Sequence, residues 1–110
     1  MITMPKPTSL NPELLRAAAG EAVAALKALG NPERLLLLCQ MSQGEISVGE
    51  LEEALGILQP TLSQQLGVLR REGMVETRRE GKKVFYRVAD ERLLALLRTL
   101  YLLYCPKEAT

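Results

Sequence analysis

Residues 47–73, SVGELEEALGILQPTLSQQLGVLRREG, contain the start and stop signals of two short helices. Ser47 and Glu50 have the spacing of a capping box, which opens the first helix, and Gly56 is typical of its end. Pro60 falls in the first turn of the second helix, because its fixed φ suits that position. A turn of only a few residues joins the two helices. The stretch therefore predicts a helix-turn-helix.

Two further helices precede this pair, and the same start signal opens both. Asn-Pro-Glu occurs at residues 11–13 and again at 31–33. Asn is a good helix cap, Pro is preorganised for the first helical position, and Glu favours the positive end of the helix dipole. We expect an amphipathic helix over about Pro12–Leu29 and a second helix over about Pro32–Ser42. The second is apolar on most sides, so we expect it to be central.

Downstream of the pair, the apolar residues alternate instead of following a helical period. Val75–Arg79 and Lys83–Val88 are rich in β-branched and aromatic residues and flank a Glu-Gly-Lys turn, which predicts a β-hairpin. A last helix is predicted from about Asp90 to Cys105. Four helices, two strands and a final helix predict a mainly α fold with a β-hairpin wing, the winged helix-turn-helix.

The composition is that of one globular domain. The chain has 110 residues, of which 47% are hydrophobic and 25% charged. We expect the domain to span residues 11–106, between a mobile lead-in at 1–10 and a C-terminal tail at 107–110. The N-terminal residues do not resemble a signal peptide, and no apolar run is long enough to span a bilayer, so we expect a cytoplasmic protein with no membrane partner.

The chain contains no histidine, which excludes many chemistries at once. Neither a Ser-His or Cys-His nucleophile pair nor an imidazole metal ligand is possible. Two cysteines make a poor zinc site unless carboxylates or another subunit complete it. The sequence has no glycine-rich nucleotide-binding motif either. We therefore expect no enzyme, no metal site and no cofactor.

The second helix of the helix-turn-helix has an apolar and a polar side. Leu62, Leu66 and Leu69 form a core-facing stripe. The opposite side carries Ser, Thr and Gln without carboxylates, and these side chains bond to bases or phosphates when a recognition helix enters the major groove. The candidate base-contacting residues are Thr61, Ser63, Gln64 and Gln65.

Basic charge is concentrated at the end of this helix and in the hairpin. Residues 70–87 carry seven Arg and Lys against three Glu, whereas residues 1–58 carry four Arg and Lys against seven Glu. The net charge of the whole chain, +1, hides this contrast. A basic helix end and wing is the footprint that phosphate binding needs. The candidate phosphate or minor-groove contacts are Arg70, Arg78, Arg79, Lys82 and Lys83.

The final helix has more apolar surface than a small monomer needs to bury. Its Leu and Tyr side chains, between Leu93 and Tyr104, cover more than one stripe of the helix. Burial against a second copy, with the first helix as neighbour, is the economical explanation. We therefore expect a homodimer through the first and last helices, which matches the two half-sites of an inverted-repeat DNA operator.

Three segments carry a resemblance to a known family. They are LKALGNPERLLLL at 26–38, the whole stretch from SVGELEEAL to FYRV at 47–88, and the apolar final helix. In these segments the chain resembles the ArsR family of bacterial winged-helix repressors, which implies a DNA-binding transcriptional repressor. Many metal-sensing members carry cysteines on the first helix of the DNA-binding pair, or His and Asp on the last helix. This chain has no cysteine in VGELEEAL and no histidine at all.

The two cysteines match the dithiol, persulfide-sensing branch of that family. Cys39 lies on the second predicted helix and Cys105 at the end of the last. The residues alone leave open whether these are ordinary core cysteines. The resemblance implies that persulfide, polysulfide or another oxidant bridges Cys39 and Cys105, that the bridged dimer leaves its operator, and that sulfide-response genes are then expressed. A bridge with extra sulfur atoms spans a wider gap than a disulfide, which needs Cα atoms within about 7 Å.

Two other interpretations remain open from the sequence. One is a metal-sensing repressor in which carboxylates or a second subunit complete a site with the cysteines. The other is a winged-helix protein–protein interaction module with no role in DNA binding.

Overall fold

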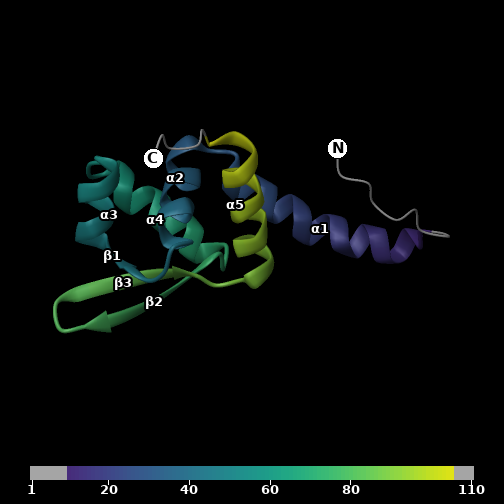
Figure 1. Ribbon diagram of the computed structural model, residues 1–110. Coiled ribbons are helices and arrows are strands. Elements are labelled where there is room, and N and C mark those ends of the chain that lie inside the picture. The colour runs from purple at the N-terminus through teal and green to yellow at the C-terminus, as the bar shows by residue number, and fades with distance from the viewer. Residues whose placement is uncertain (1–9, 106–110) are drawn as a thin grey trace.

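The computed structural model describes residues 10–105 and shows a winged helix-turn-helix (Figure 1). The predicted helices and both predicted hairpin strands are present. The predicted tail, and all but the last residue of the predicted lead-in, lie outside the described residues. In chain order the elements are α1 (Pro12–Leu29), α2 (Pro32–Met41), β1 (Ile46–Ser47), α3 (Val48–Leu55), α4 (Thr61–Arg71), β2 (Val75–Glu80), β3 (Lys83–Val88) and α5 (Glu91–Tyr104).

The helix starts form where the sequence signals predict them. The Asn11 side chain accepts a hydrogen bond from the Glu13 N–H at 2.9 Å, and the Asn31 side chain accepts one from the Arg34 N–H at 3.0 Å. Both halves of the capping box that opens α3 are made as well. Since these caps satisfy backbone donors that the first turn leaves without partners, they place the helix boundaries locally.

The strand β1 is a departure from the predicted order of elements. Ile46 pairs with Tyr86 and Ser47 with Phe85, so β1 runs antiparallel to β3 and the sheet order is β1-β3-β2. A segment of only two residues is too short to show an alternating pattern in the sequence. Its pairing depends on β3 lying beside it, which is a tertiary contact.

Helix α2 is the centre of the fold, as its apolar sequence predicts. It contacts each of the other four helices and also β3. Leu37 and Leu38 are fully buried there, and the predicted stripe of α4 is buried beside them. A shift of α2 therefore reaches α4 directly.

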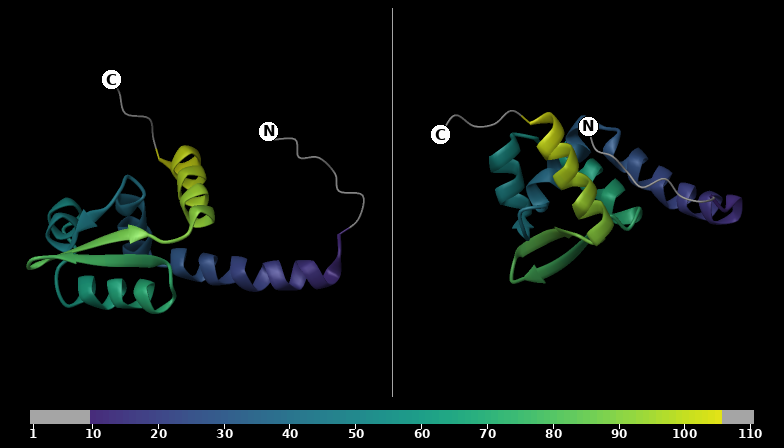
Figure 2. Two further views of the ribbon diagram at one scale, coloured as in Figure 1. Left: turned by 90° about the horizontal axis from the view of Figure 1, so that it is seen from below. Right: turned by 45° about the vertical axis from the view of Figure 1, so that its right-hand side comes forward.

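Helix α1 projects away from the body of the molecule, on the side opposite the wing (Figures 1 and 2). The radius of gyration is 16.2 Å, against about 13 Å for a compact chain of this size. Only Ala28 of α1 is buried. In the described part of the chain, no helix is both long and apolar enough to cross a membrane.

Candidate nucleic-acid interface and dithiol cavity

The polar side of α4 is exposed at its N-terminal end. Ser63 and Gln64 are exposed, whereas Thr61 is half-buried. Pro60 offers no side-chain cap, and the Gln59 side chain accepts a hydrogen bond from the Ser63 N–H at 3.1 Å in its place. The start of α4 is thus held without using the side chains of Ser63 or Gln64, which remain available to a partner.

Gln65 differs from its neighbours on α4. Its side chain is half-buried, and its Oε1 accepts a hydrogen bond from Nη1 of Arg34 at 3.0 Å. Of the four predicted base-contacting residues, the structure thus leaves Ser63 and Gln64 exposed and Thr61 half-buried at the start of α4, and turns Gln65 toward Arg34 of α2.

The basic residues of the helix end and wing are exposed. Arg70, Arg79, Lys82 and Lys83 form no salt bridge with any residue in the described range. Unpaired cations on an exposed hairpin and helix end are available to phosphates.

Arg78 is the exception among the predicted phosphate contacts. Its guanidinium lies 2.7 Å from Glu45 and 2.8 Å from Glu80, and it stacks over the Phe85 ring at 4.6 Å from the centroid. The two carboxylates hold the pKa of Arg78 above its ordinary value. Arg78 thus connects the wing to the segment before β1.

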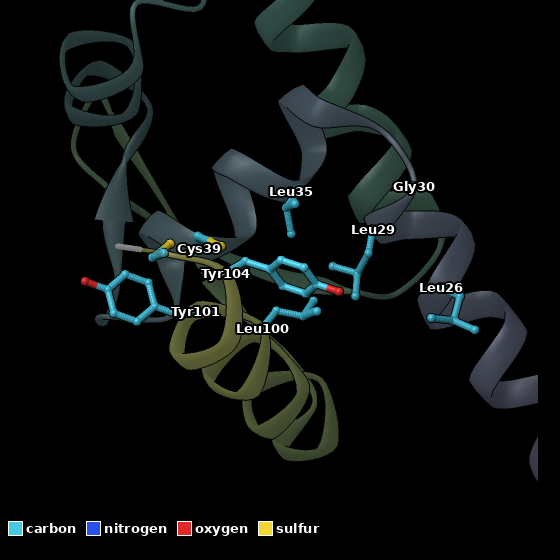
Figure 3. A pocket seen from close by; sticks show the side chains of 9 residues that line it. Leu26, Leu29, Gly30, Leu35, Cys39, Leu100, Tyr101 and Tyr104 are labelled. Carbon is cyan, nitrogen blue, oxygen red and sulfur yellow. The ribbon is translucent and has the colours of Figure 1, made fainter. Parts of the chain in front are cut away.

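Both cysteines line one apolar cavity of about 380 Å³, between α1, α2 and α5 (Figure 3). Figure 3 shows the Tyr104 ring projecting from α5 toward the side chains of α1 and α2. Nearly all of the lining surface is apolar. The cavity is lined by Leu26, Leu29, Gly30, Leu35, Cys39, Leu100, Tyr101, Tyr104 and Cys105.

The two thiols are free and lie in different environments. Cys39 is half-buried on α2, and Cys105 is exposed at the C-terminal cap of α5. Burial raises the pKa of the Cys39 thiol, and the charge of a nearby Cys105 thiolate raises it further. The thiolate is the nucleophilic form of cysteine, so Cys39 is held in its less reactive state while Cys105 is the accessible thiol.

A second, smaller cavity reaches Cys39 from another side. It measures about 230 Å³ and shares only Cys39 and Tyr101 with the larger one. Arg98, Ser42 and Gln43 make it more polar. Cys39 therefore lies between two hollows, one of which also reaches Cys105.

The described residues contain no ready metal-binding cluster. Within residues 10–105, no three cysteine, aspartate or glutamate side chains are grouped so that they surround one point.

Two features of the site were not predicted from the sequence. The first is Arg34, a cation in the first turn of α2, where the helix dipole disfavours it. That mismatch is a sequence signal that Arg34 has acceptors elsewhere. The second is the role of Tyr101 and Tyr104 as cavity walls, for which the sequence shows only an apolar run.

Comparison with known proteins identifies the family. The profile described as "Bacterial regulatory protein, arsR family" matches residues 31–77. A biofilm growth-associated repressor of Agrobacterium fabrum is 54% identical over 90 residues, covering 82% of this chain and 77% of that protein. The chain belongs to the ArsR family. It is a transcriptional regulator and not an enzyme.

Solved structures of ArsR-type proteins share the fold. The transcriptional repressor BigR from Xylella fastidiosa superposes with a TM-score of 0.81 at 48% identity, covering 89% of this chain and all of that one. A homodimeric winged helix-turn-helix DNA-binding domain from Mycobacterium bovis superposes with a TM-score of 0.70 at 31% identity, covering 88% of this chain and 89% of that one.

Proposed function

We propose that this ArsR regulator is a homodimeric, DNA-binding repressor that leaves its operator when sulfur atoms bridge Cys39 and Cys105. The observation that carries the proposal is that both thiols line a single apolar cavity formed by α1, α2 and α5. A reaction in that cavity joins the central helix to the last helix.

DNA binding is supported by the surface of α4 and the wing. Ser63 and Gln64 are exposed at the start of α4, and exposed cations that form no salt bridge with a described residue follow at its end and on the hairpin. Recognition helices read bases with residues in this position, while exposed cations bind the backbone. Thr61, Ser63 and Gln64 are the proposed base contacts, and Arg70, Arg79, Lys82 and Lys83 the proposed phosphate contacts.

Dimerisation is supported by the apolar surface of α1 and α5. Residues 101–104 of α5 are between 53% and 80% exposed, and Leu14 and Leu26 of α1 are 69% and 58% exposed. A monomeric soluble protein rarely exposes so continuous an apolar surface. A second copy of this chain covers it, as the homodimeric Mycobacterium domain suggests, and its two-fold symmetry suits an inverted-repeat operator.

The bridging reaction has two steps, and each step releases one thiolate from the polysulfide. The Cys105 thiolate attacks an inner sulfur of a polysulfide R–S–Sn–S–R′, breaks one S–S bond and releases RS⁻. The Cys39 thiolate then attacks the sulfur bonded to S–R′ and releases R′S⁻. The product is Cys39–S–Sn–S–Cys105, the two protein thiols are oxidised by two electrons, and their protons pass to the two leaving thiolates.

The lining of the cavity supports an inducer made largely of sulfur atoms. A chain of sulfur atoms is polarisable and apolar, so it fits a cavity with few hydrogen-bonding groups. A charged peptide disulfide such as glutathione disulfide loses its hydration there without gaining partners. We therefore expect polysulfide to react in preference to glutathione disulfide or peroxide.

The bridge acts on DNA binding through the central helix. Because α2 contacts both α5 and α4, a bridge that holds the end of α5 against Cys39 shifts α2 and, through it, the recognition helix. In a two-fold dimer such a shift changes the distance between the two recognition helices, and binding to paired half-sites is lost.

The decisive experiment is a DNA-binding titration of the reduced protein before and after treatment with sodium tetrasulfide. The probe is a duplex that the wild-type protein selects from a random pool. We expect the affinity to fall by about 5- to 150-fold, a typical range for coupling between sites. Intact mass spectrometry should show one intramolecular bridge that carries extra sulfur.

Matched variants decide which part of the proposal holds. Cys39→Ser and Cys105→Ser should bind the duplex like the reduced protein and should not respond to tetrasulfide. Unchanged affinity of the bridged wild type, or a full response in Cys39→Ser, contradicts the proposal. If zinc or copper shifts the titration while tetrasulfide does not, the chain is a metal sensor. If a salt-dependent interaction with duplex DNA is missing altogether, the DNA-binding role is wrong.

A further inference from the structure

Arg34 joins three helices through one guanidinium group. It lies in the first turn of α2, and each of its three nitrogens donates to a different acceptor. Nε donates to the Ala28 carbonyl at 2.9 Å, Nη2 to the Lys27 carbonyl at 2.9 Å, and Nη1 to Oε1 of Gln65 at 3.0 Å. Because the guanidinium is planar and its N–H directions are fixed, three such bonds define where the acceptors lie relative to one another.

The position of Arg34 is explained by α1 and α4 and not by its own helix. A cation is unfavourable at the N-terminus of α2, because that end of the helix dipole is positive. At the last turn of α1 it is favourable, since the dipole is negative there and the final carbonyls have no partners within the helix. Arg34 supplies a partner to the Ala28 carbonyl, and a second donor to the Lys27 carbonyl, which also accepts the Gly30 N–H.

Gln65 is the contact of this group on the recognition helix. A guanidinium only donates hydrogen bonds, so the amide oxygen of Gln65, and not its nitrogen, must face Arg34. Bidentate readout of adenine by glutamine requires both amide atoms to face the base. In this arrangement the half-buried Gln65 is turned toward Arg34, while the preceding Gln64 is exposed.

We propose that Arg34 is a positioning residue for DNA recognition, and that it fixes the orientation of α4 against the end of α1 through Gln65. The inference rests on the proposed function, in which α4 reads DNA and α1 lies in the dimer interface. Since α1 is shared with the second copy, the Arg34–Gln65 bond sets where each recognition helix stands relative to its symmetry mate.

This role predicts how the affinity for DNA changes when the Arg34–Gln65 bond is removed. Without the bond, α4 varies in orientation, and binding to two correctly spaced half-sites must restrict that variation. Specific binding therefore weakens more than binding to an unrelated duplex. The salt dependence stays the same, because Arg34 acts through acceptors of the protein itself and releases no counterions from DNA.

The test is a double-variant cycle on the selected duplex. Arg34→Lys keeps the charge, but a single ammonium on a flexible stem does not reproduce three directed bonds. Gln65→Met removes the acceptor from α4 and leaves Arg34 and its bonds to α1 in place. We expect each variant to lose about tenfold in affinity, which corresponds to about 1.4 kcal/mol. The double variant should lose no more than either single variant.

Gln64→Ala is the matched control for the cycle. Gln64 is adjacent to Gln65 and exposed, so the factors by which Gln64→Ala and Arg34→Lys lower the affinity for the duplex should multiply in the double variant. Sedimentation velocity and thermal unfolding check that each variant is a folded dimer, and Gln65→Met carries the test if Arg34→Lys does not fold.

The outcomes separate this inference from the function on which it rests. If the wild type binds its duplex and Arg34→Lys binds equally well, the positioning role is wrong and the DNA-binding role stands. Three other results also overturn the inference. The affinity losses of Arg34→Lys and Gln65→Met multiply in the double variant, Gln65→Met alone changes the base preference, or Arg34→Lys reduces the salt slope. A wild type that selects no duplex contradicts the proposed function itself.

Discussion

Cys39 shows how its surroundings set the chemistry of a single side chain. In the sequence it is one more apolar position on an apolar helix, and its half-buried state would suit an inert core cysteine. What distinguishes it is that it shares an apolar cavity with Cys105. Desolvation and a neighbouring thiolate both keep Cys39 protonated, so the exposed Cys105 is expected to react first.

Replacing Cys105 should lower the pKa of Cys39 without returning it to the ordinary value. The change Cys105→Ser removes the thiolate charge that opposes ionisation of Cys39, while burial, the larger cause of the raised pKa, remains. At a fixed pH near the pKa, the thiolate fraction and the alkylation rate of Cys39 should therefore rise. Alkylation with iodoacetamide across a pH series, read by peptide mass spectrometry, measures this shift, and an unchanged or higher pKa would contradict it.

Lys82 should act as a simple phosphate contact. It is exposed and forms no salt bridge with a described residue. The change Lys82→Gln should weaken binding to selected and unrelated duplexes alike and reduce the slope of log K against log salt by about 0.9. Arg78→Gln is the comparison. Because Arg78 already pairs with Glu45 and Glu80, its replacement should change the salt slope less than Lys82→Gln does. Equal slopes for Lys82→Gln and wild type would mean that Lys82 does not contact phosphate.

At the scale of elements, the start of α3 is determined by a pair of reciprocal hydrogen bonds. The Ser47 N–H donates to Oε1 of Glu50 at 3.1 Å, and the Glu50 N–H donates to Oγ of Ser47 at 3.2 Å. Ser47 is also a residue of β1, paired with Phe85. One residue thus ends the short strand and begins the helix, which ties the first helix of the helix-turn-helix to the sheet.

Removing the cap should destabilise the fold as a whole. The change Ser47→Ala takes away a buried acceptor at the helix N-terminus and should lower the free energy of unfolding by about 1 kcal/mol. Urea denaturation monitored by circular dichroism measures it. Thr99→Ala, which changes an exposed hydroxyl within α5, should alter the free energy of unfolding much less. Similar losses in the two variants would show that the cap has no special role.

The same capping box should make stability depend on pH in the acidic range. The hydrogen bonds from Ser47 lower the pKa of Glu50 below its ordinary value. A depressed carboxylate pKa contributes stability that is present above the unfolded-state pKa and is lost as the pH falls through the folded-state pKa. Glu50→Gln keeps a hydrogen-bond acceptor that does not titrate, so its stability should fall less steeply on acidification. Parallel curves for wild type and Glu50→Gln, from denaturation at several pH values, would contradict this.

At the scale of the whole molecule, α1 and α5 share an apolar surface that one chain alone leaves exposed. Helix α1 projects from the body (Figure 2), and Glu21 of α1 forms a salt bridge with Arg92 of α5. Between these helices and the turn after α4 lies a hollow of about 600 Å³, which apolar side chains line together with Glu21, Glu72, Asp90 and Arg92. A single chain leaves this surface exposed, so the complete fold is expected to require the second copy.

A charge placed on this surface should dissociate the dimer. Leu103 of α5 and Leu58 of the turn between α3 and α4 are both 67% exposed, so they form a matched pair. The change Leu103→Glu should shift sedimentation velocity toward the monomer, because an unpaired carboxylate would be buried in the interface. Leu58→Glu should remain dimeric. Dissociation by both variants, or by neither, would place the interface elsewhere.

The sequence predicts nearly every element of this fold because the relevant signals are local. Caps, turn glycines and apolar periods act over a few residues, and they were sufficient for the helices, the hairpin and the polar face of α4. The same signals do not distinguish Gln64 from Gln65, which are neighbours on that face. The strand β1 was missed because two residues carry no period.

Local sequence signals in this chain of 110 residues do not reveal which distant side chains come into contact. The helix-turn-helix, its basic wing and its apolar terminal helices follow from the sequence, since each is defined by neighbours along the chain. The common cavity of Cys39 and Cys105, and the bond from Arg34 to Gln65, arise only when α1, α4 and α5 pack around α2. Packing decides them because burial and hydrogen bonding between separate helices depend on the whole core, and not on any one segment.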